Sequence, residues 1–154
     1  MENLNLPTYS FKIKSELQRK LIFDSIRKKY VVLTPEEWVR QNFIQYLVDE
    51  KGYRGSLIAV EKKVDVNLLP QRSDIILYNR NAQAVMIVEC KSAKVKITQD
   101  VFNQVARYNM KLRVPFLVVT NGLQHYCCQM DYEKRTFQFI PEIPFYESIK
   151  NYQD

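Results

Sequence analysis

Two neighbouring stretches decide the fold: Arg72-Ser73-Asp74-Ile75-Ile76-Leu77-Tyr78 and, after a short turn, Val85-Met86-Ile87-Val88-Glu89-Cys90-Lys91. Both read as apolar β-strands, yet they contain Asp74, Glu89 and Lys91. Because side chains alternate between the faces of a strand, Glu89 and Lys91 are expected beside Val85 and Ile87, with Met86, Val88 and Cys90 on the other face. Burying an unpaired charge costs on the order of several kcal/mol, so such groups are usually paired or bind a metal. The pattern therefore indicates a functional site.

The three charged residues suit phosphodiester hydrolysis. Asp74 at the start of one strand can meet Glu89 and Lys91 on the next, because paired strands lie about 4.8 Å apart. The carboxylates are hard ligands suited to Mg²⁺, with Mn²⁺ as a substitute, and the backbone carbonyl of Cys90 is a further candidate ligand. The metal would polarise a phosphate and acidify a water, and the Lys91 ammonium would orient that water or stabilise the phosphorus centre. For Asp74 alone, the alternative is a turn residue that bonds nearby backbone.

Other charged sequences have simpler interpretations. Glu61-Lys62-Lys63 lies where a strand becomes polar, and Asp49-Glu50-Lys51 lies at a helix end, so both are interpreted as solvated charges. Arg27-Lys28-Lys29 is interpreted as a solvated turn. These segments are therefore not expected to contribute to the site.

The remaining elements predict a mixed β-sheet with helices against its faces, an α/β or α+β fold. Thr34-Pro35-Glu36-Glu37 is typical of a helix start, and apolar spacing continues that helix to about Glu50. Thr98 is expected to cap a second helix that buries Val101, Val105, Tyr108 and Leu112. Strands are expected at 9–14 paired with 21–23, and at 56–64, 74–78, 84–91, 116–120, 124–130 and 137–140, with 65–71 as a polar connector.

Length and composition indicate one domain over residues 1–154, with an N-terminal hairpin extension (1–33), a core (34–140) and a tail of short helix or coil (141–154). The net charge of +6 favours a polyanionic partner such as nucleic acid. No apolar run reaches the ~18 residues of a membrane span and the start lacks a secretion signal, so a cytoplasmic location is expected. Three cysteines, two of them adjacent, form no disulfide framework, which agrees with a reducing compartment.

Two motifs together resemble the PD-(D/E)xK nuclease superfamily: Asp74 with Glu89-Cys90-Lys91, and Gln104-Val105-Ala106-Arg107-Tyr108, which is similar to the Gln-x-x-x-Tyr motif of its RecB-like branch. More closely, the sequence from Thr34-Pro35-Glu36-Glu37-Trp38-Val39-Arg40-Gln41 through Thr120-Asn121-Gly122 is similar to the N-terminal nuclease domain of type I restriction enzyme R subunits. The resemblance implies a restriction-endonuclease-like sheet flanked by helices, with Asp74, Glu89 and Lys91 as the metal-dependent catalytic set. Ser73 stands where the family often has a proline.

The resemblance also implies roles for residues outside this set. Gln104 and Tyr108 lie four apart, hence on one helical face, and would approach the active centre and the DNA backbone; the alternative is a core tyrosine. Glu37 is a candidate for a first-helix acid that supports the metal site. Glu36 is its rival, and a capping box at Glu37 is the alternative explanation.

Several basic residues are candidate phosphate contacts. Lys94 and Lys96 follow the catalytic strand, and Arg107 and Lys111 lie on the next helix; surface solvation explains them equally well. Arg72, two residues before Asp74, could clamp a phosphate or the aspartate itself.

The expected function is a Mg²⁺-dependent DNA endonuclease domain of a restriction system. The alternatives are a catalytically silent nuclease-fold module that binds nucleic acid or docks to a restriction or defence complex, and a purely structural interaction protein. The P-loop pattern GxxxxGK[ST] is absent from the chain, so a helicase or translocase, like a specificity subunit, would be a separate partner. Cutting both strands would require a homodimer or two successive nicks.

Overall fold

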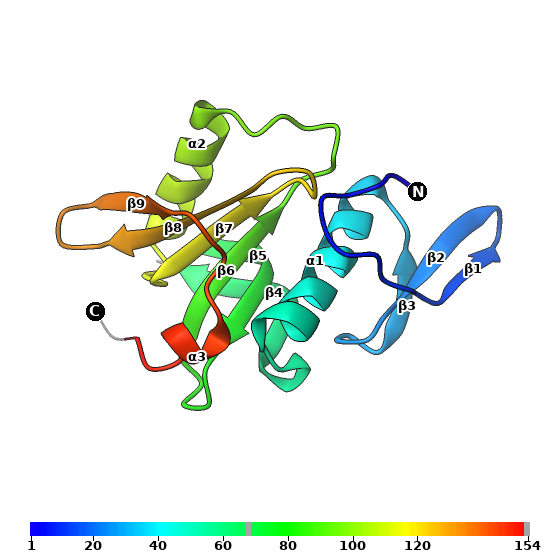
Figure 1. Ribbon diagram of the computed structural model, residues 1–154, viewed down its shortest axis with the longest axis horizontal. Coiled ribbons are helices and arrows are strands. Elements are labelled where there is room, and N and C mark those ends of the chain that lie inside the picture. Colours follow the sequence, from blue (N-terminus) through cyan, green and yellow to red (C-terminus); the bar gives the residue numbers. More distant parts are fainter. Residues whose placement is uncertain (67–68, 153–154) are drawn as a thin grey trace.

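The computed structural model describes residues 1–66 and 69–152, without the side chains of residues 62–66 and 69–73. A small antiparallel sheet comes first, followed by a larger mixed sheet in the order β4-β5-β6-β7-β8-β9 (Figure 1). The small sheet comprises β1 (Ile13–Glu16), β2 (Arg19–Asp24) and β3 (Lys29–Val32). The large sheet comprises β4 (Ile58–Val66), β5 (Leu69–Tyr78), β6 (Ala84–Cys90), β7 (Phe116–Thr120), β8 (His125–Asp131) and β9 (Thr136–Ile140). The helices are α1 (Pro35–Lys51), α2 (Gln99–Met110), α3 (Tyr146–Ile149) and the 3-10 turn η1 (Gly55–Leu57).

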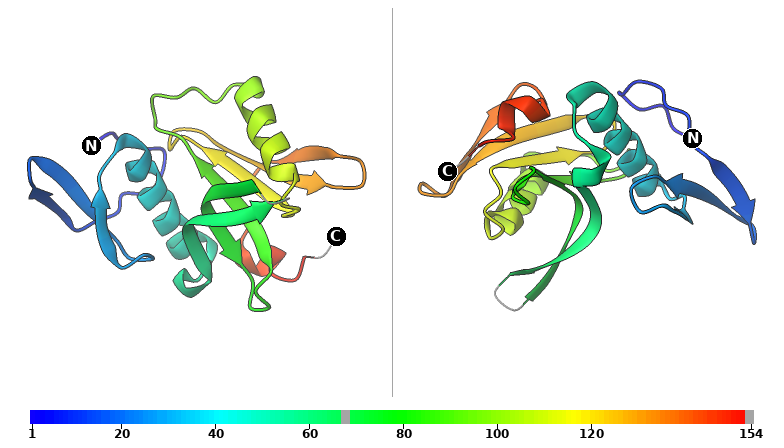
Figure 2. Two further views of the ribbon diagram at one scale, coloured as in Figure 1. Left: turned by 180° about the vertical axis from the view of Figure 1, so that it is seen from behind. Right: turned by 90° about the horizontal axis from the view of Figure 1, so that it is seen from below.

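The large sheet confirms the expected mixed architecture. Strands β6 and β7 run parallel, joined by the crossover that contains α2, and the other neighbours are antiparallel. Helices α1 and α2 cover opposite faces of this sheet (Figure 2). Among the described residues, no helix has the length and apolarity to cross a membrane.

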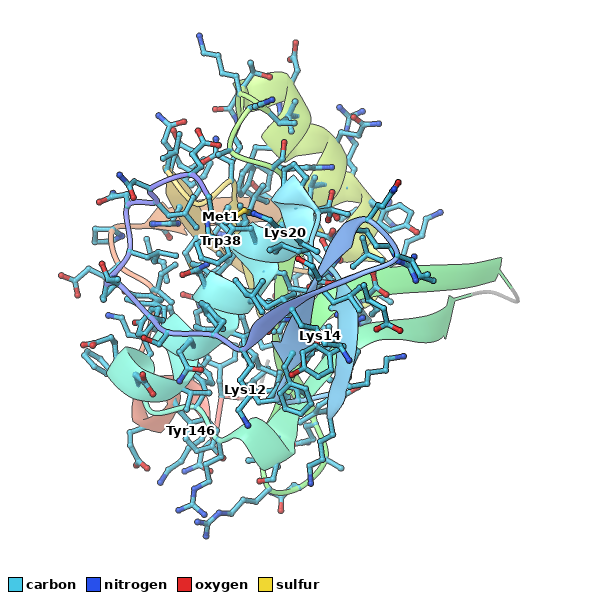
Figure 3. All side chains as sticks on the ribbon, turned by 90° about the vertical axis from the view of Figure 1, so that its right-hand side faces the viewer. Met1, Lys12, Lys14, Lys20, Trp38 and Tyr146 are labelled. Atoms are coloured by element: carbon cyan, nitrogen blue, oxygen red, sulfur yellow. The ribbon has the colours of Figure 1, made fainter. Side chains whose placement is uncertain are left out.

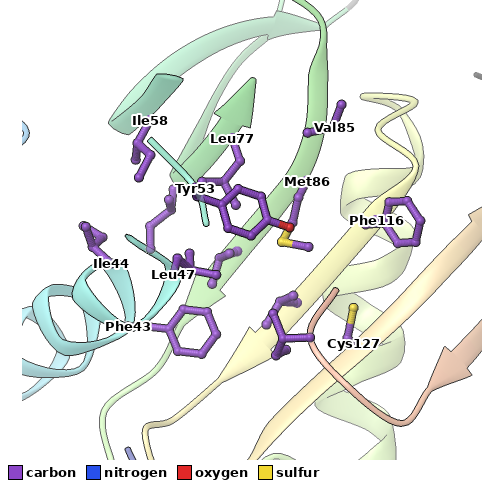
Figure 4. Close-up of a cluster of buried hydrophobic side chains, with 14 of the residues drawn as sticks. Phe43, Ile44, Leu47, Tyr53, Ile58, Leu77, Val85, Met86, Phe116 and Cys127 are labelled. Atoms are coloured by element: carbon purple, nitrogen blue, oxygen red, sulfur yellow. The ribbon is translucent and has the colours of Figure 1, made fainter. Parts of the chain in front are cut away.

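Helix α1 forms as its sequence predicts. The Thr34 hydroxyl accepts a hydrogen bond from the Glu37 N–H at 3.0 Å, which satisfies one of the free donors of the first turn. Gly52 ends the helix in the left-handed conformation. The apolar stripe of α1 packs on β5, β6 and β7, with Val39, Phe43 and Leu47 fully buried in the cluster shown in Figure 4.

Helix α2 presents a different face from the one expected. Thr98 caps it, as predicted, but its buried residues are Phe102, Ala106 and Asn109. Tyr108 is 48% exposed, so the core-tyrosine interpretation is wrong. The Phe102 ring packs against the aromatic rings of β9, and burying this large ring rotates the helix by about one position from the predicted stripe.

The hairpin of β4 and β5 is longer than the sequence indicates (Figure 2). The expected polar connector 65–71 falls largely within the two strands, and the ladder continues to Val66 opposite Leu69. Backbone hydrogen bonds form such a ladder whatever the polarity of the side chains. The pattern of apolar residues therefore does not show how far the two strands extend. Asp74 therefore lies inside β5 and not at its start.

The remaining strands follow the predictions with small shifts. The expected N-terminal hairpin is present, with Ile13 opposite Ile22, but β1 starts later and β3 joins it as a third strand. In β6, Val85 stands at a register shift between β5 and β6, so it packs with Met86 in the α1-side cluster and not with Ile87. Strands β7, β8 and β9 and the short helix α3 lie where they were predicted.

Candidate active site

Asp74 and Glu89 meet as predicted. The register that places Ile75 opposite Val88 and Ile76 opposite Ile87 brings residues 74 and 89 opposite each other at the end of the paired segment. Asp74 Oδ2 accepts a hydrogen bond from the Cys90 N–H at 2.8 Å, and burial together with the charge of Asp74 raises the pKa of the neighbouring Glu89. Two carboxyl groups are thus neighbours at the end of the β5–β6 ladder.

Glu89 is a largely buried carboxyl group beside a second carboxyl group. Burial, and then the negative charge of Asp74, raise the pKa of Glu89 to about 8. Its Oε1 is buried without a hydrogen-bond partner in the described part of the chain. A divalent cation would give this oxygen a partner and remove the repulsion between the two carboxylates, so the donor set fits a hard metal ion.

Lys91 stands next to this pair. It is the first residue after β6, and its backbone N–H donates to the Thr120 carbonyl at 2.8 Å. Its positive charge partly offsets the rise in the pKa of Glu89 and of Glu36, although both remain raised. Within the described residues Lys91 forms no ion pair, so its ammonium is not committed to one carboxylate.

The second oxygen of Asp74 has an unexpected partner. Arg40, on α1, places Nη2 3.0 Å from Asp74 Oδ1 and is only 4% exposed. Each carboxylate oxygen carries two lone pairs, so both oxygens of Asp74 keep one for a metal ion after accepting Arg40 and Cys90. The ion pair therefore fixes Asp74 without using up its capacity as a ligand.

A chain of alternating charges leads from Asp74 to the N-terminal sheet. Arg40 Nη1 donates to Glu37 Oε1 at 2.8 Å, and Arg27 Nη2 donates to the same oxygen at 2.8 Å. Arg27 Nε then contacts Oδ2 of Asp24 at 2.6 Å, and Asp24 is fully buried. The small sheet, α1 and β5 are thereby joined through paired charges.

Two interpretations of charged residues are corrected by this network. Glu61 is not a solvated charge: its carboxylate contacts Arg27 at 3.2 Å and Arg40 at 3.3 Å. It has a φ of +52° and lies at the gap in the β4–β5 ladder, opposite Asp74. Arg27 is not part of a solvated turn, because its side chain is 16% exposed and contacts three carboxylates. Apart from Asp24, their partners lie ten or more residues away in sequence, so local patterns do not reveal the network.

The structure distinguishes Glu36 from Glu37. The Glu37 N–H donates to the Thr34 hydroxyl, as a capping box requires. Its buried carboxylate, however, accepts hydrogen bonds from Arg27, Arg40 and Gln41 and not from the backbone N–H of Thr34. The Glu36 side chain is 48% exposed, and burial followed by the charge of Asp74 raises its pKa. Glu36 is therefore the first-helix acid whose charge acts on the Asp74–Glu89 pair, while the carboxylate of Glu37 is engaged by Arg27, Arg40 and Gln41.

No ready-made cluster of three metal-binding side chains (His, Cys, Asp or Glu) occurs among the residues that the structure describes. Mg²⁺ is commonly held by one or two carboxylates and keeps several waters, so Asp74 and Glu89 satisfy its usual requirement. The Cys90 carbonyl remains a predicted ligand. The Cys90 thiol is buried, and that burial raises its pKa.

The predicted nucleic-acid contacts gather elsewhere. Gln104, Arg107 and Tyr108 line an open depression of about 610 Å³ on the outer face of α2, whose lining does not include the carboxylate pair. Lys94 and Lys96 are exposed in the loop after β6, which the Asn121 amide holds through the Val95 carbonyl at 2.8 Å. Arg72 lies in β5, with its side chain outside the described part.

A second depression, the N-terminal groove, lies beside the site. It has a volume of about 770 Å³ and connects the small sheet with the start of α1, with β4 and with the residue that follows Lys91. Its lining includes Arg19, Tyr30, Glu36, Arg40, Glu61 and Ser92. Of these, Arg40 could have been anticipated, since its spacing of three and four from Glu37 and Glu36 is that of helical ion pairs.

The raised pKa of Glu89 has a measurable effect on stability. The folded protein holds this proton more tightly than the unfolded chain, so the stabilisation is complete below about pH 4.5 and is lost as the pH rises through about 8. In EDTA, the free energy of unfolding of wild type relative to Glu89→Gln should fall by roughly 3–5 kcal/mol between pH 5 and pH 9. Urea denaturation measures this difference, and a pH-independent difference would contradict the electrostatic account of Glu89.

Residues 35–144 match the family model described as the N terminus of type I restriction enzyme R proteins. A solved fragment structure assigned as an HsdR subunit of a type I restriction enzyme from Vibrio vulnificus YJ016 is similar to this chain, with a TM-score of 0.54 and 20% sequence identity. The similarity covers 76% of this chain and 24% of the other, so this chain spans about a quarter of that fragment, and the likeness shows the fold alone. No curated protein matches the chain.

Proposed function

This chain belongs to the family of type I restriction enzyme R protein N termini, and on that premise we propose that it is a metal-dependent deoxyribonuclease domain of a restriction system. One observation carries the proposal. The buried Glu89 Oε1 has no hydrogen-bond partner in the part of the chain that the structure describes, although Glu89 is paired with Asp74 and lies in the field of Lys91. A metal site explains why a strand retains such a costly arrangement.

Asp74 and Glu89 would hold Mg²⁺ or Mn²⁺, with the Cys90 carbonyl as a further ligand. When bound, the ion would polarise the scissile phosphate and make a water more acidic. The two carboxylates would place this charge at the edge of the sheet, where a phosphodiester could reach it.

The protein's own groups have separate tasks. Lys91 would donate to the phosphate or orient the attacking water, because its ammonium is a compact charge with three donors. Arg40 would keep Asp74 in one orientation through the 3.0 Å ion pair. Glu36 would accept a proton or position a water from the side of α1, since it lies in the field of Asp74 and Lys91.

The substrate class in this proposal is DNA, and the partners are the other subunits of a restriction complex, including those that supply a motor and sequence specificity. Cleavage of both strands would use a homodimer or two successive nicks. The second candidate function is a silent nuclease-fold module. It is favoured by the ion pair that already occupies Asp74 Oδ1.

Incubation of supercoiled plasmid DNA with the protein in Mg²⁺ or Mn²⁺ separates the two functions. The proposal expects metal-dependent nicking that EDTA stops. Background nicking at every metal concentration and on linear, supercoiled and single-stranded DNA would overturn catalysis and leave the silent module.

A further inference from the structure

The positive charge of this protein is concentrated in the small N-terminal sheet. Residues 9–33 contain seven Lys or Arg and two Asp or Glu, so this segment alone carries +5 of the chain's net +6. One of the two acids, Asp24, is buried against Arg27. The exposed charges are Lys12, Lys14, Arg19, Lys20, Lys28 and Lys29 against Glu16.

One face of this sheet combines cations with aromatic rings. The register places Lys14 opposite Leu21 and Phe23 opposite Tyr30, so these side chains share a face with Arg19. The Lys14 ammonium lies 4.1 Å from the centroid of the Tyr30 ring, and the Phe23 and Tyr30 rings are 5.2 Å apart. We call Lys12, Lys14, Arg19, Phe23 and Tyr30 the basic-aromatic face, and Figure 3 views the side of the molecule that carries it.

The basic-aromatic face opens toward the candidate active site. Arg19 and Tyr30 line the N-terminal groove together with Glu36 and Glu61. The lining of the groove also includes Ser92, which directly follows Lys91, and Arg40, which is paired with Asp74. A chain that lay along this groove would pass from the cationic sheet to residues that adjoin Lys91 and Asp74.

This sheet also lies outside the family match, which covers residues 35–144. The family match starts at residue 35, after β3 ends at Val32. The network from Asp24 through Arg27 to Glu37 nevertheless fixes the sheet to α1. A cationic surface added to the domain and held rigidly against the groove has the properties of a substrate-binding element.

We infer that the basic-aromatic face binds the phosphodiester backbone of duplex DNA and directs it along the N-terminal groove to the carboxylate pair. The inference deepens the proposed function and rests on it for the choice of DNA. Lys and Arg side chains supply the affinity by displacing counterions from phosphates, without reading sequence. The rings of Phe23 and Tyr30 hold Lys12 and Lys14, respectively, in position through cation–π contacts.

The test compares two double variants that remove equal charge. Lys14→Gln/Arg19→Gln changes the basic-aromatic face. Lys134→Gln/Arg135→Gln changes two exposed cations at the β8–β9 turn, at the opposite end of the molecule in Figure 1. Binding of a fluorescent duplex is measured by anisotropy in EDTA over about 50–200 mM NaCl.

The first variant should weaken binding by at least about tenfold and reduce the slope of log affinity against log salt by about 1.8, since each phosphate contact contributes about 0.9. The control variant should stay within about twofold of wild type. If Lys14→Gln/Arg19→Gln does not fold, Arg19→Gln alone should show about half the change in slope.

Equal affinities of the two double variants would overturn the inference, as would wild type that binds no duplex at the lowest salt. Binding to single-stranded RNA or to anionic vesicles in place of the duplex would also overturn it. Calorimetric Mn²⁺ titration of the same variants keeps the two proposals apart. Reduced DNA affinity with unchanged Mn²⁺ binding supports the inference even if wild type fails to cleave, and that failure would count only against the proposed function.

Discussion

Lys91→Ala should abolish DNA nicking, lowering the rate by at least about 100-fold, which is the usual cost of removing one group that stabilises developing charge. The charge of Lys91 only partly offsets the raised pKa of Glu89, and Lys91 forms no ion pair among the described residues, so its removal breaks no salt bridge there. Folding should therefore persist, and metal-free duplex affinity should remain near that of wild type. Plasmid nicking in Mn²⁺, followed over time, measures the rate.

The matched control is Lys94→Ala, which removes the same charge from an exposed position three residues later. It should change the rate by only a few-fold, because one peripheral phosphate contact acts on binding and not on the reacting phosphorus. Equal rates for wild type and Lys91→Ala would show that Lys91 is not part of a catalytic centre.

Arg40→Met should reduce the free energy of unfolding by about 3–5 kcal/mol, the cost of removing one partner from a buried charge pair. Burial lowers the Arg40 pKa, but the charges of Glu37 and Asp74 more than offset this and raise it above its ordinary range. Without Arg40, the carboxylates of Glu37, Glu61 and Asp74 lose a shared cation. Because domains of this size are stable by about 5–15 kcal/mol, the loss is a large fraction of the total.

Urea denaturation followed by circular dichroism measures this loss, with Arg80→Met as the control. Arg80 is an exposed turn residue, and its substitution should cost less than about 0.5 kcal/mol. If Arg40→Met unfolds outright, Arg40→Lys should retain part of the stability because it keeps the charge without the planar fork. A cost below about 1 kcal/mol for Arg40→Met would mean that the network does not join α1 to the sheet.

Local patterns in the sequence were sufficient to predict the strands that carry the site. Asp74 and Glu89 converge because alternation and hairpin pairing depend on neighbours in sequence. The cap at Thr34 and the helix that follows it are also local features. The mixed sheet and its flanking helices followed from the order of these elements.

The residues that hold Asp74 in place could not be predicted in the same way. Arg27 and Glu61 are 34 positions apart, and only the folded chain brings them to one another and to Arg40. The prediction of which face of α2 is buried was wrong for a related reason. Phe102 packs on aromatic rings of β9, and the spacing of apolar residues along the helix does not reveal this contact. Ionic partners and aromatic packing between distant elements thus depend on the tertiary fold and leave no local pattern in the sequence.

Calorimetric titration with Mn²⁺ at pH 7 tests the central claim most directly. Wild type should bind one ion and release a proton, because burial and Asp74 keep Glu89 protonated at this pH; the heat should therefore depend on the buffer's ionisation enthalpy. Glu89→Gln should lose this binding, while the exposed control Glu133→Gln should retain it. Equal binding by Glu89→Gln and wild type, or no binding by wild type, would contradict the assignment of Asp74 and Glu89 as a metal site.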